Sequence, residues 1–260
     1  MNMTDKHEHH DPVGRVEDAR LTTGSGKYTA DWNLPGQLYA CFLRSDRADA
    51  EIASPNVAPA LKHPGVKRVL TGEDAVRAGY TKQMHTLTFP GKGGRETRSP
   101  ERPVLAHGKV RYVGEAVALV VADSAGAAQD AVELIEVSYR DLPPAVHPEE
   151  ALAPGAPQLH ETVPGNLSQE CEAGDAAAVE AAFAKAAHVT RLKVEVTRAA
   201  PHPMGPRACT VTHDVRDGSY TLYTCMQGVT TMRKGLSVYT GVPEDKLHLV
   251  AEDVGGGFGQ

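Results

Sequence analysis

Residues 110–139, with the sequence VRYVGEAVALVVADSAGAAQDAVELIEVSY, decide the fold that the chain predicts. Within them, the apolar run at 115–122 has the length and continuity of a strand covered on both faces. Ser124 then stands where a helix N-cap is favoured, before an alanine-rich segment that presents an apolar side. Residues 134–139 alternate as a second strand. The stretch therefore predicts a compact β-α-β unit.

Further elements are predicted on both sides of this unit. Upstream, the hydrophobic pattern predicts strands at 37–44 and 66–70 and a short helix at 71–78. Downstream, it predicts helices at 175–187 and 230–240, and strands at 189–197, 208–214, 219–226 and 247–252.

The composition is that of a soluble chain with enough apolar residues to build a core. Hydrophobic residues make up 41% of the 260 residues, and the formal net charge of −6 argues against a nucleic-acid partner. No apolar run approaches the roughly 18 residues of a membrane-spanning helix. The polar residues 1–11 lack the apolar stretch of a secretory signal, so we expect a cytoplasmic location.

Several common motifs are absent from the chain. The sequence Gly24-Ser25-Gly26-Lys27 is not a phosphate-binding loop, because Tyr28 stands where Ser or Thr must bind magnesium. No C-x-x-C pair occurs, so we expect neither a zinc site nor an iron–sulfur cluster on the four cysteines, which are Cys41, Cys171, Cys209 and Cys225.

Three features near the ends of the downstream strands converge. Residues 203–207 form the rigid segment PMGPR, Gln227-Gly228 follows one strand, and the glycine-rich residues 255–259 follow another. Ligands in α/β sheets bind beyond the carboxyl ends of strands. Glycines let backbone N–H groups approach an anionic or oxo-bearing ligand, and a primary amide both donates and accepts. The glycine run by itself is also compatible with a tight turn.

These motifs, in this order, resemble the molybdopterin-binding large subunit of the xanthine dehydrogenase, aldehyde oxidase and carbon monoxide dehydrogenase family. The resemblance begins with VGRVEDARL at 13–21 and GSGKY at 24–28, and it includes residues 110–139 and the three downstream features. It implies an α+β fold, in which an α/β hammerhead domain is followed by the start of a mixed α/β molybdopterin-binding domain.

The proline-rich residues 148–164 and the resemblance together suggest domain ranges. We predict a flexible tail at 1–12, the hammerhead domain at 13–147, a linker at 148–165 and an incomplete molybdopterin-binding domain at 166–260.

The resemblance also implies a cofactor and its binding residues. The cofactor is molybdopterin with molybdenum, and the residues that match its contacts in the family are Gln227, Gly228, Gly256, Gly257, Phe258 and Gly259. The family hydroxylates an electron-poor carbon, and its electrons leave through iron–sulfur clusters and FAD, which we expect on partner subunits.

Two departures from the family bear on activity. Gly205 replaces the glutamate that the family often has in this segment, and the family's catalytic glutamate lies beyond the matched region. We therefore assign no catalytic residue and expect no activity from the chain alone. Three hypotheses stay open: a part completed by a second large-subunit chain, an inactive truncation, and a stand-alone binding or scaffold module without redox activity. Purines, aldehydes, N-heterocycles and carbon monoxide all stay open as substrates.

Overall fold

The computed structural model describes residues 14–80, 90–100, 102–196 and 200–259. The described chain falls into two compact units. The terminal unit comprises the described parts of 1–34, 198–237 and 242–260, and the central unit those of 35–197 and 238–241. The predicted tail at 1–12 lies outside the described residues. The two units divide the chain differently from the predicted domain ranges, because residues 14–34 group with the C-terminal strands and residues 166–196 group with the central unit.

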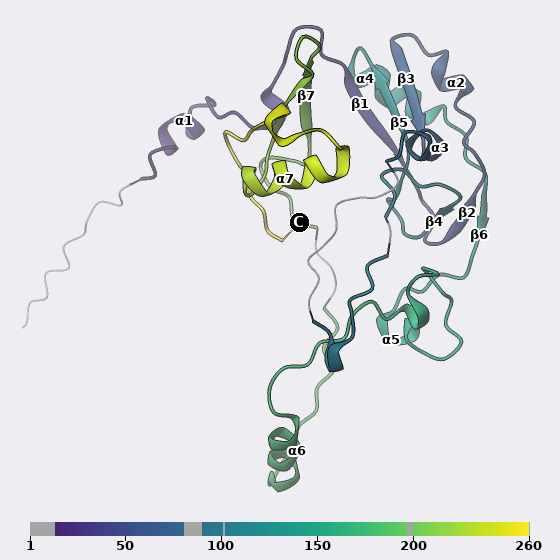
Figure 1. Ribbon diagram of the computed structural model, residues 1–260, viewed down its shortest axis with the longest axis vertical. Coiled ribbons are helices and arrows are strands. Elements are labelled where there is room, and N and C mark those ends of the chain that lie inside the picture. Colours follow the sequence, from purple (N-terminus) through teal and green to yellow (C-terminus); the bar gives the residue numbers. More distant parts are fainter. Residues whose placement is uncertain (1–13, 81–89, 101, 197–199, 260) are drawn as a thin grey trace, which may run out of the picture. The chain divides into compact units, whose positions relative to one another are not determined.

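The central unit is built around a three-stranded antiparallel sheet with the order β1-β5-β3 (Figure 1). These strands are Tyr39–Arg44, Ala116–Ala122 and Val66–Thr71, as the sequence predicts. The helix α4, Ala125–Glu133, packs against β1 and β5. Its predicted N-cap is confirmed, since the Ser124 hydroxyl accepts a hydrogen bond from the Ala127 N–H at 3.1 Å.

The predicted β-α-β unit is wrong in its second strand. The strand β6 spans Tyr139–Asp141 and belongs to a different sheet, in which β2, Ala50–Ile52, lies between β6 and β4, Lys109–Val110. The alternation at 134–139 has another origin. Ile135 is buried with α4 and β5, whereas Tyr139 packs on the second cluster around Val110. The segment thus runs between two small hydrophobic clusters, and its apolar residues pack partly on one and partly on the other.

Short helices complete the central unit. The helix α3, Gly72–Arg77, confirms the prediction for 71–78. The segment predicted as a linker contains α5, Pro148–Ala151, and is tied down by Asn166, whose side-chain amide donates to the carbonyls of Ala151 at 2.9 Å and Pro157 at 2.8 Å. The other helices of this unit are α2, Ala58–Leu61, α6, Ala176–Lys185, and the 3-10 turns Lys92–Gly94 and Pro164–Asn166.

One predicted strand is not formed. Residues 189–196 alternate in sequence, yet the structure gives them no strand assignment, and residue 197 lies outside the described residues. Alternation sets which face a strand presents, but a strand forms only where a neighbouring edge supplies hydrogen bonds.

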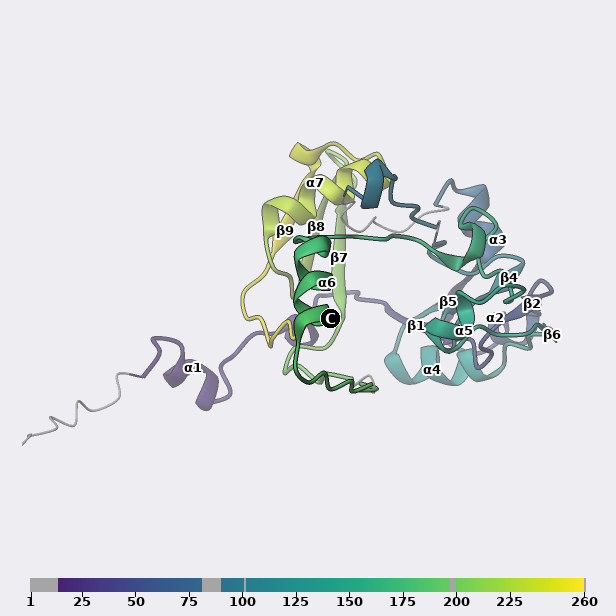
Figure 2. The same cartoon turned by 90° about the horizontal axis from the view of Figure 1, so that it is seen from below.

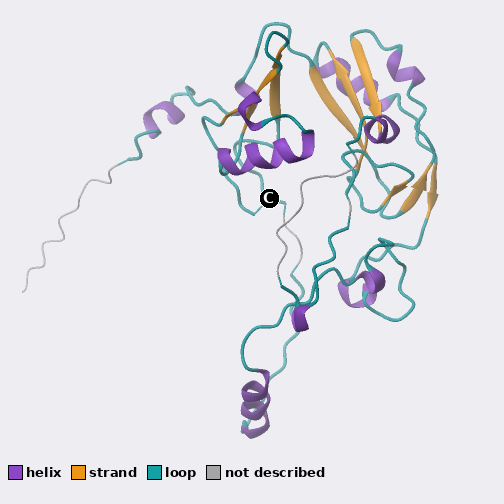
Figure 3. Cartoon of the chain, viewed as in Figure 1, coloured by secondary structure: helices purple, strands orange, loops and turns teal. Residues whose placement is uncertain are grey.

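The terminal unit contains a further three-stranded sheet, with the order β7-β8-β9 (Figure 2). The strands β7, Cys209–Asp214, and β8, Ser219–Thr224, form the predicted hairpin, and β9, Leu247–Val250, runs parallel to β8. The predicted helix between β8 and β9 is α7, Val229–Thr240 (Figure 3). The remaining elements are α1, Asp18–Thr22, and the 3-10 turns Thr29–Asp31 and Glu244–Lys246.

The two N-caps of the central unit should differ in their effect on stability. Ser124→Ala should lower the free energy of unfolding, measured by hydrogen exchange of the β5 amides, by about 1 kcal/mol. Asp175→Ala removes the equivalent cap of α6, where the carboxylate accepts from the Ala178 N–H at 2.9 Å. Every residue of α6 is exposed, so this control should leave β5 exchange unchanged. Equal losses in both variants would contradict the packing described here.

Candidate functional site

The site lies in the terminal unit, where two neighbouring parallel strands end. Gln227 follows β8 and the glycine loop, residues 255–259, follows β9. Since β8 and β9 are paired in parallel, their carboxyl ends open at the same edge of the sheet. A pocket of about 480 Å³ lies there. It is lined by Pro203, Gly205, Pro206, Arg207, Cys225, Met226, Gln227, Met232, Val254, Gly256, Gly257 and Gly259.

The PMGPR segment packs directly on the glycine loop. The Met204 N–H donates to the Gly255 carbonyl at 3.2 Å. A Cβ atom on Gly255 would overlap the backbone of Met204 and Gly205, so this approach requires glycine. A Cβ on Gly205 would lie 3.2 Å from the Gly255 nitrogen, which is tight but not an overlap. The glycine at 205, which departs from the family pattern, therefore stands where two backbones meet closely.

Gln227 packs against the other side of the loop. A Cβ on Gly257 would overlap the side-chain nitrogen of Gln227, so the amide lies directly against the loop backbone. A Cβ on Gly256 would overlap the ring of Phe258. Phe258 itself has a positive φ of 48°, which is unusual for a bulky residue, and its side chain is 71% exposed. The loop thus combines bare backbone, one amide and one exposed aromatic ring.

Asp253, just before the loop, joins it to the N-terminal segment. The Arg20 guanidinium donates to the Asp253 carboxylate with both terminal nitrogens, one of them at 2.7 Å. The Lys27 backbone N–H donates to the same carboxylate at 2.6 Å, and the Asp253 N–H donates back to the Lys27 carbonyl at 3.3 Å. The Asp253 side chain is nearly buried, and these donors lower its pKa, the Arg20 hydrogen bond most of all.

The N-terminal segment makes a second attachment at the end of β8. The Cys225 N–H donates to the Thr29 hydroxyl at 2.7 Å. The Trp32 ring lies 4.1 Å from that of Tyr223, centroid to centroid, and the Lys27 ammonium lies over the Trp32 ring at 3.4 Å. Residues 20–32 therefore hold both strand ends that carry the pocket.

The structure brings most of the predicted site residues together. Gln227, Gly256, Gly257 and Gly259 line the pocket. Gly228 has a positive φ of 88°, and its carbonyl accepts from the Met232 N–H at the start of α7. Asp253 and the pocket-lining Cys225 were not among the site residues predicted from the sequence. The position of Asp253 close to the glycine run is the sequence feature that could have indicated its role.

Other kinds of site find no support in the described residues. No group of three or more His, Cys, Asp or Glu side chains is placed there to bind a metal ion. Within the same ranges, no helix is both long and apolar enough to cross a membrane.

Two family models match the chain in succession. The first, described as aldehyde oxidase and xanthine dehydrogenase, a/b hammerhead domain, matches residues 23–143. The second, described as molybdopterin cofactor-binding domain, matches residues 159–260.

The two curated relatives named here are a large chain and a large subunit. The chain is 36% identical to the carbon monoxide dehydrogenase large chain of Afipia carboxidovorans, with 94% of this chain and 30% of the relative covered. It is also 36% identical to the nicotine 6-hydroxylase large subunit of Paenarthrobacter nicotinovorans, with 95% and 29% covered.

Solved structures agree with this relationship. The chain matches quinoline 2-oxidoreductase from Pseudomonas putida with a TM-score of 0.83 and 34% identity, over 95% of this chain and 30% of that one. It matches the Cu,Mo-CO dehydrogenase with a TM-score of 0.80 and 35% identity, over 95% and 31%.

The chain belongs to the family of molybdopterin-binding oxidoreductase large subunits that includes xanthine dehydrogenase, aldehyde oxidase and carbon monoxide dehydrogenase. It matches their N-terminal part and spans about 30% of the length of the curated relatives named here.

Asp253→Asn should destabilise the terminal unit in a pH-dependent way. Because the folded pKa of Asp253 lies below the ordinary value of 3.8, the native carboxylate contributes stability that is fully present above that value. This contribution is lost as the pH falls through the lower, folded pKa. The difference between the parent chain and the variant should therefore be largest near neutral pH and shrink in acid.

The measurement is urea unfolding followed by the fluorescence of Trp32, the single tryptophan of the chain, at a series of pH values. Glu252→Gln is the matched control, since it removes a carboxylate from the neighbouring, exposed position. A pH-independent loss in Asp253→Asn, or an equal loss in Glu252→Gln, would contradict the assignment.

Proposed function

We propose that this chain forms one side of the molybdopterin site of a molybdenum hydroxylase, with Gln227, Gly228 and the loop residues Gly256, Gly257, Phe258 and Gly259 contacting the cofactor. The observation that carries the proposal is the pocket at the ends of β8 and β9, in which Gln227 lies against a glycine backbone that leaves no room for side chains. The match of residues 159–260 to a molybdopterin cofactor-binding domain supports it.

The chemistry of the lining fits this group. An oxo- and phosphate-bearing cofactor needs hydrogen-bond donors, and backbone N–H groups free of Cβ atoms supply them at close range. The Gln227 amide can donate to an oxo group through its nitrogen and accept from a hydroxyl through its oxygen. Arg207, also in the lining, adds a permanent positive charge.

Phe258 supports a binding role for the loop. Its left-handed backbone and its exposed ring both cost free energy in the chain alone. Such a cost persists where a function requires the geometry, and contact between the ring and a bound cofactor would recover part of it.

The division of labour follows from these residues. When bound, the cofactor supplies the redox chemistry of its molybdenum. The chain's own groups bind and orient it: the amide of Gln227 fixes one polar group, and the loop backbone fixes others without reorganising. The hydrogen bonds from Arg20 and Lys27 to Asp253 hold the loop in place for cofactor binding.

The rest of the site requires more polypeptide than this chain provides. Its relatives are about three times as long, so we propose that a second large-subunit polypeptide, or a further region of the same protein, completes the pocket and supplies the catalytic base. Iron–sulfur and flavin subunits would then accept the electrons. We propose the same domain ranges as the sequence predicts: a hammerhead domain at 13–147, a linker at 148–165 and a cofactor-binding domain from 166 onward.

The proposal predicts how molybdenum content responds to the loop. Gly257→Ala forces the Gln227 amide away from the loop, and Gln227→Ala removes it. In the complex purified from the source cells, each variant should lower the molybdenum bound per chain, measured by elemental analysis, by about tenfold. A tenfold loss corresponds to about 1.4 kcal/mol, which is close to the contribution of one hydrogen bond to a charged group.

Gly126→Ala is the control for a glycine substitution, since a Cβ there meets open space on α4. It should leave the molybdenum content unchanged. If the parent complex contains no molybdenum, or if Gly257→Ala and Gln227→Ala retain all of it, the proposed cofactor role is wrong.

A further inference from the structure

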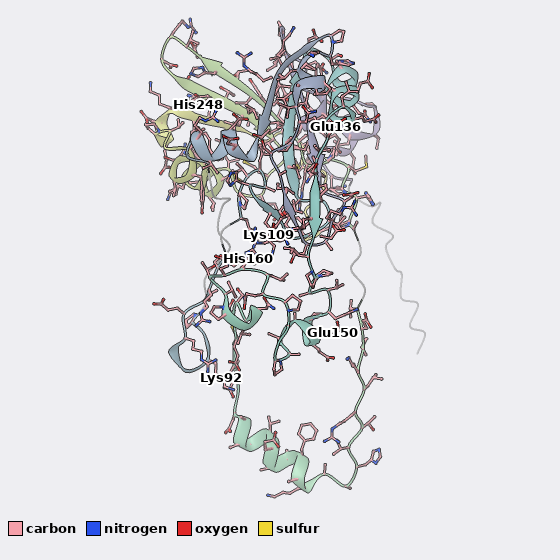
Figure 4. All side chains as sticks on the ribbon, turned by 90° about the vertical axis from the view of Figure 1, so that its right-hand side faces the viewer. Lys92, Lys109, Glu136, Glu150, His160 and His248 are labelled. Atoms are coloured by element: carbon pink, nitrogen blue, oxygen red, sulfur yellow. The ribbon has the colours of Figure 1, made fainter. Side chains whose placement is uncertain are left out.

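The segment from α6 to residue 196 carries apolar side chains that nothing in the described chain covers. All ten residues of α6 are exposed, although Val179 and Phe183 lie four positions apart and so share one face of the helix. Their exposed fractions are 51% and 58%. Figure 4 shows the side chains along this helix.

The alternating residues that follow α6 are exposed even further. Leu192, Val194 and Val196 occupy every second position, and their exposed fractions are 83%, 68% and 85%. In an extended chain, every second side chain lies on the same face. Within the described chain, residues 189–196 make no backbone–backbone hydrogen bond. Both the apolar face and the backbone edge of this segment are therefore without a partner there.

The other face of the segment is polar and partly fixed. Lys193 forms an ion pair with Glu149 of α5, with 2.7 Å between the ammonium nitrogen and the carboxylate oxygen. Arg191 and Glu195 share that face by their spacing. The segment therefore has two faces. The charged face contacts the central unit through Lys193, whereas the apolar face is largely exposed within the described chain.

We propose that residues 190–196 add as a strand to an exposed sheet edge of the polypeptide that supplies the rest of the large subunit, and that Val179 and Phe183 of α6 pack on the same polypeptide. The inference rests on the proposed function, because it concerns the partner that completes that protein. Strand addition gives the backbone groups of this segment hydrogen-bond partners. It also buries the apolar side chains at alternate positions in pockets of the partner.

The comparison with solved structures favours this occupant. The quinoline enzyme matches 95% of this chain with a TM-score of 0.83, yet about 70% of its own length lies outside the match. That remaining polypeptide is part of the same protein chain and is large enough to cover a surface of this size. Five large apolar residues lie exposed on a segment of 21 residues, and exposed apolar surface of this kind is typical of a protein interface.

Hydrogen exchange tests the strand directly. In the chain alone, the amides of residues 190–196 should exchange as in an open chain, because no described backbone group protects them. In the complex purified from the source cells, a peptide spanning these residues should exchange at least about tenfold more slowly. Unchanged exchange in the complex would overturn the proposal.

Paired substitutions test the apolar face. Leu192→Asp with Val194→Asp should reduce recovery of the large-subunit partner with the purified chain by at least about tenfold. Arg191→Asp, which introduces the same residue on the opposite face, should leave recovery unchanged. Because the altered side chains are exposed, the thermal unfolding of the chain alone should not change in either variant.

A photo-crosslinking residue placed at position 192 captures the contacting polypeptide, which mass spectrometry then identifies. A crosslink to a polypeptide matching the remainder of the large subunit supports the proposal. A crosslink to a second copy of this chain, or to the iron–sulfur or flavin subunit, overturns it.

The two proposals can fail separately. A complex that assembles through position 192 but contains no molybdenum contradicts the cofactor role and leaves the docking surface standing. A molybdenum-containing complex that assembles normally with Leu192→Asp and Val194→Asp contradicts the docking surface alone.

Discussion

The buried carboxylate of Asp253 is the interaction on which the site depends. It accepts hydrogen bonds from Arg20 and from the Lys27 backbone, so it joins a segment near the start of the chain to a position two residues before the glycine loop. Glycines alone would leave that loop free to adopt many conformations. The Arg20–Asp253 pair fixes one end of the loop, the backbone of Met204 and Gly205 packs on Gly255, and the Gln227 side chain packs on Gly257. A preorganised pocket results from this charge pair and these two close contacts.

Much of the fold was predictable, because local pattern and tertiary context agree there. The strand β5 and the helix α4 follow from an apolar run, a serine cap and an alanine-rich face. The strand predictions that are wrong concern segments whose tertiary contacts differ from what their local pattern indicates. Residues 134–139 read as one strand, but Ile135 serves the first core and Tyr139 the second, and periodicity cannot tell one core from two. Residues 189–196 have the pattern of a strand but no partner in the described chain.

The site was predictable to the extent that topology fixes it. Gln227 and the glycine loop each follow a strand, and parallel pairing of those strands brings them together. The sequence could not indicate that Phe258 folds over Gly256 or that Met204 bonds to Gly255, because both depend on backbone angles and on contacts between distant segments. Arg20 and Asp253 are separated by 233 positions, and no local pattern pairs them. The predicted domain ranges accordingly placed the two ends of the chain in different domains, whereas the structure groups them in one unit.

The most direct measurement is a cryo-electron microscopy structure of the complex assembled in the source cells. The account predicts cofactor density against the backbone of Gly256 and Gly257, with the Gln227 amide facing it and the Arg20–Asp253 pair intact. A pocket occupied by protein side chains, or a loop rearranged so that Gln227 and Gly257 are separated, would contradict the account.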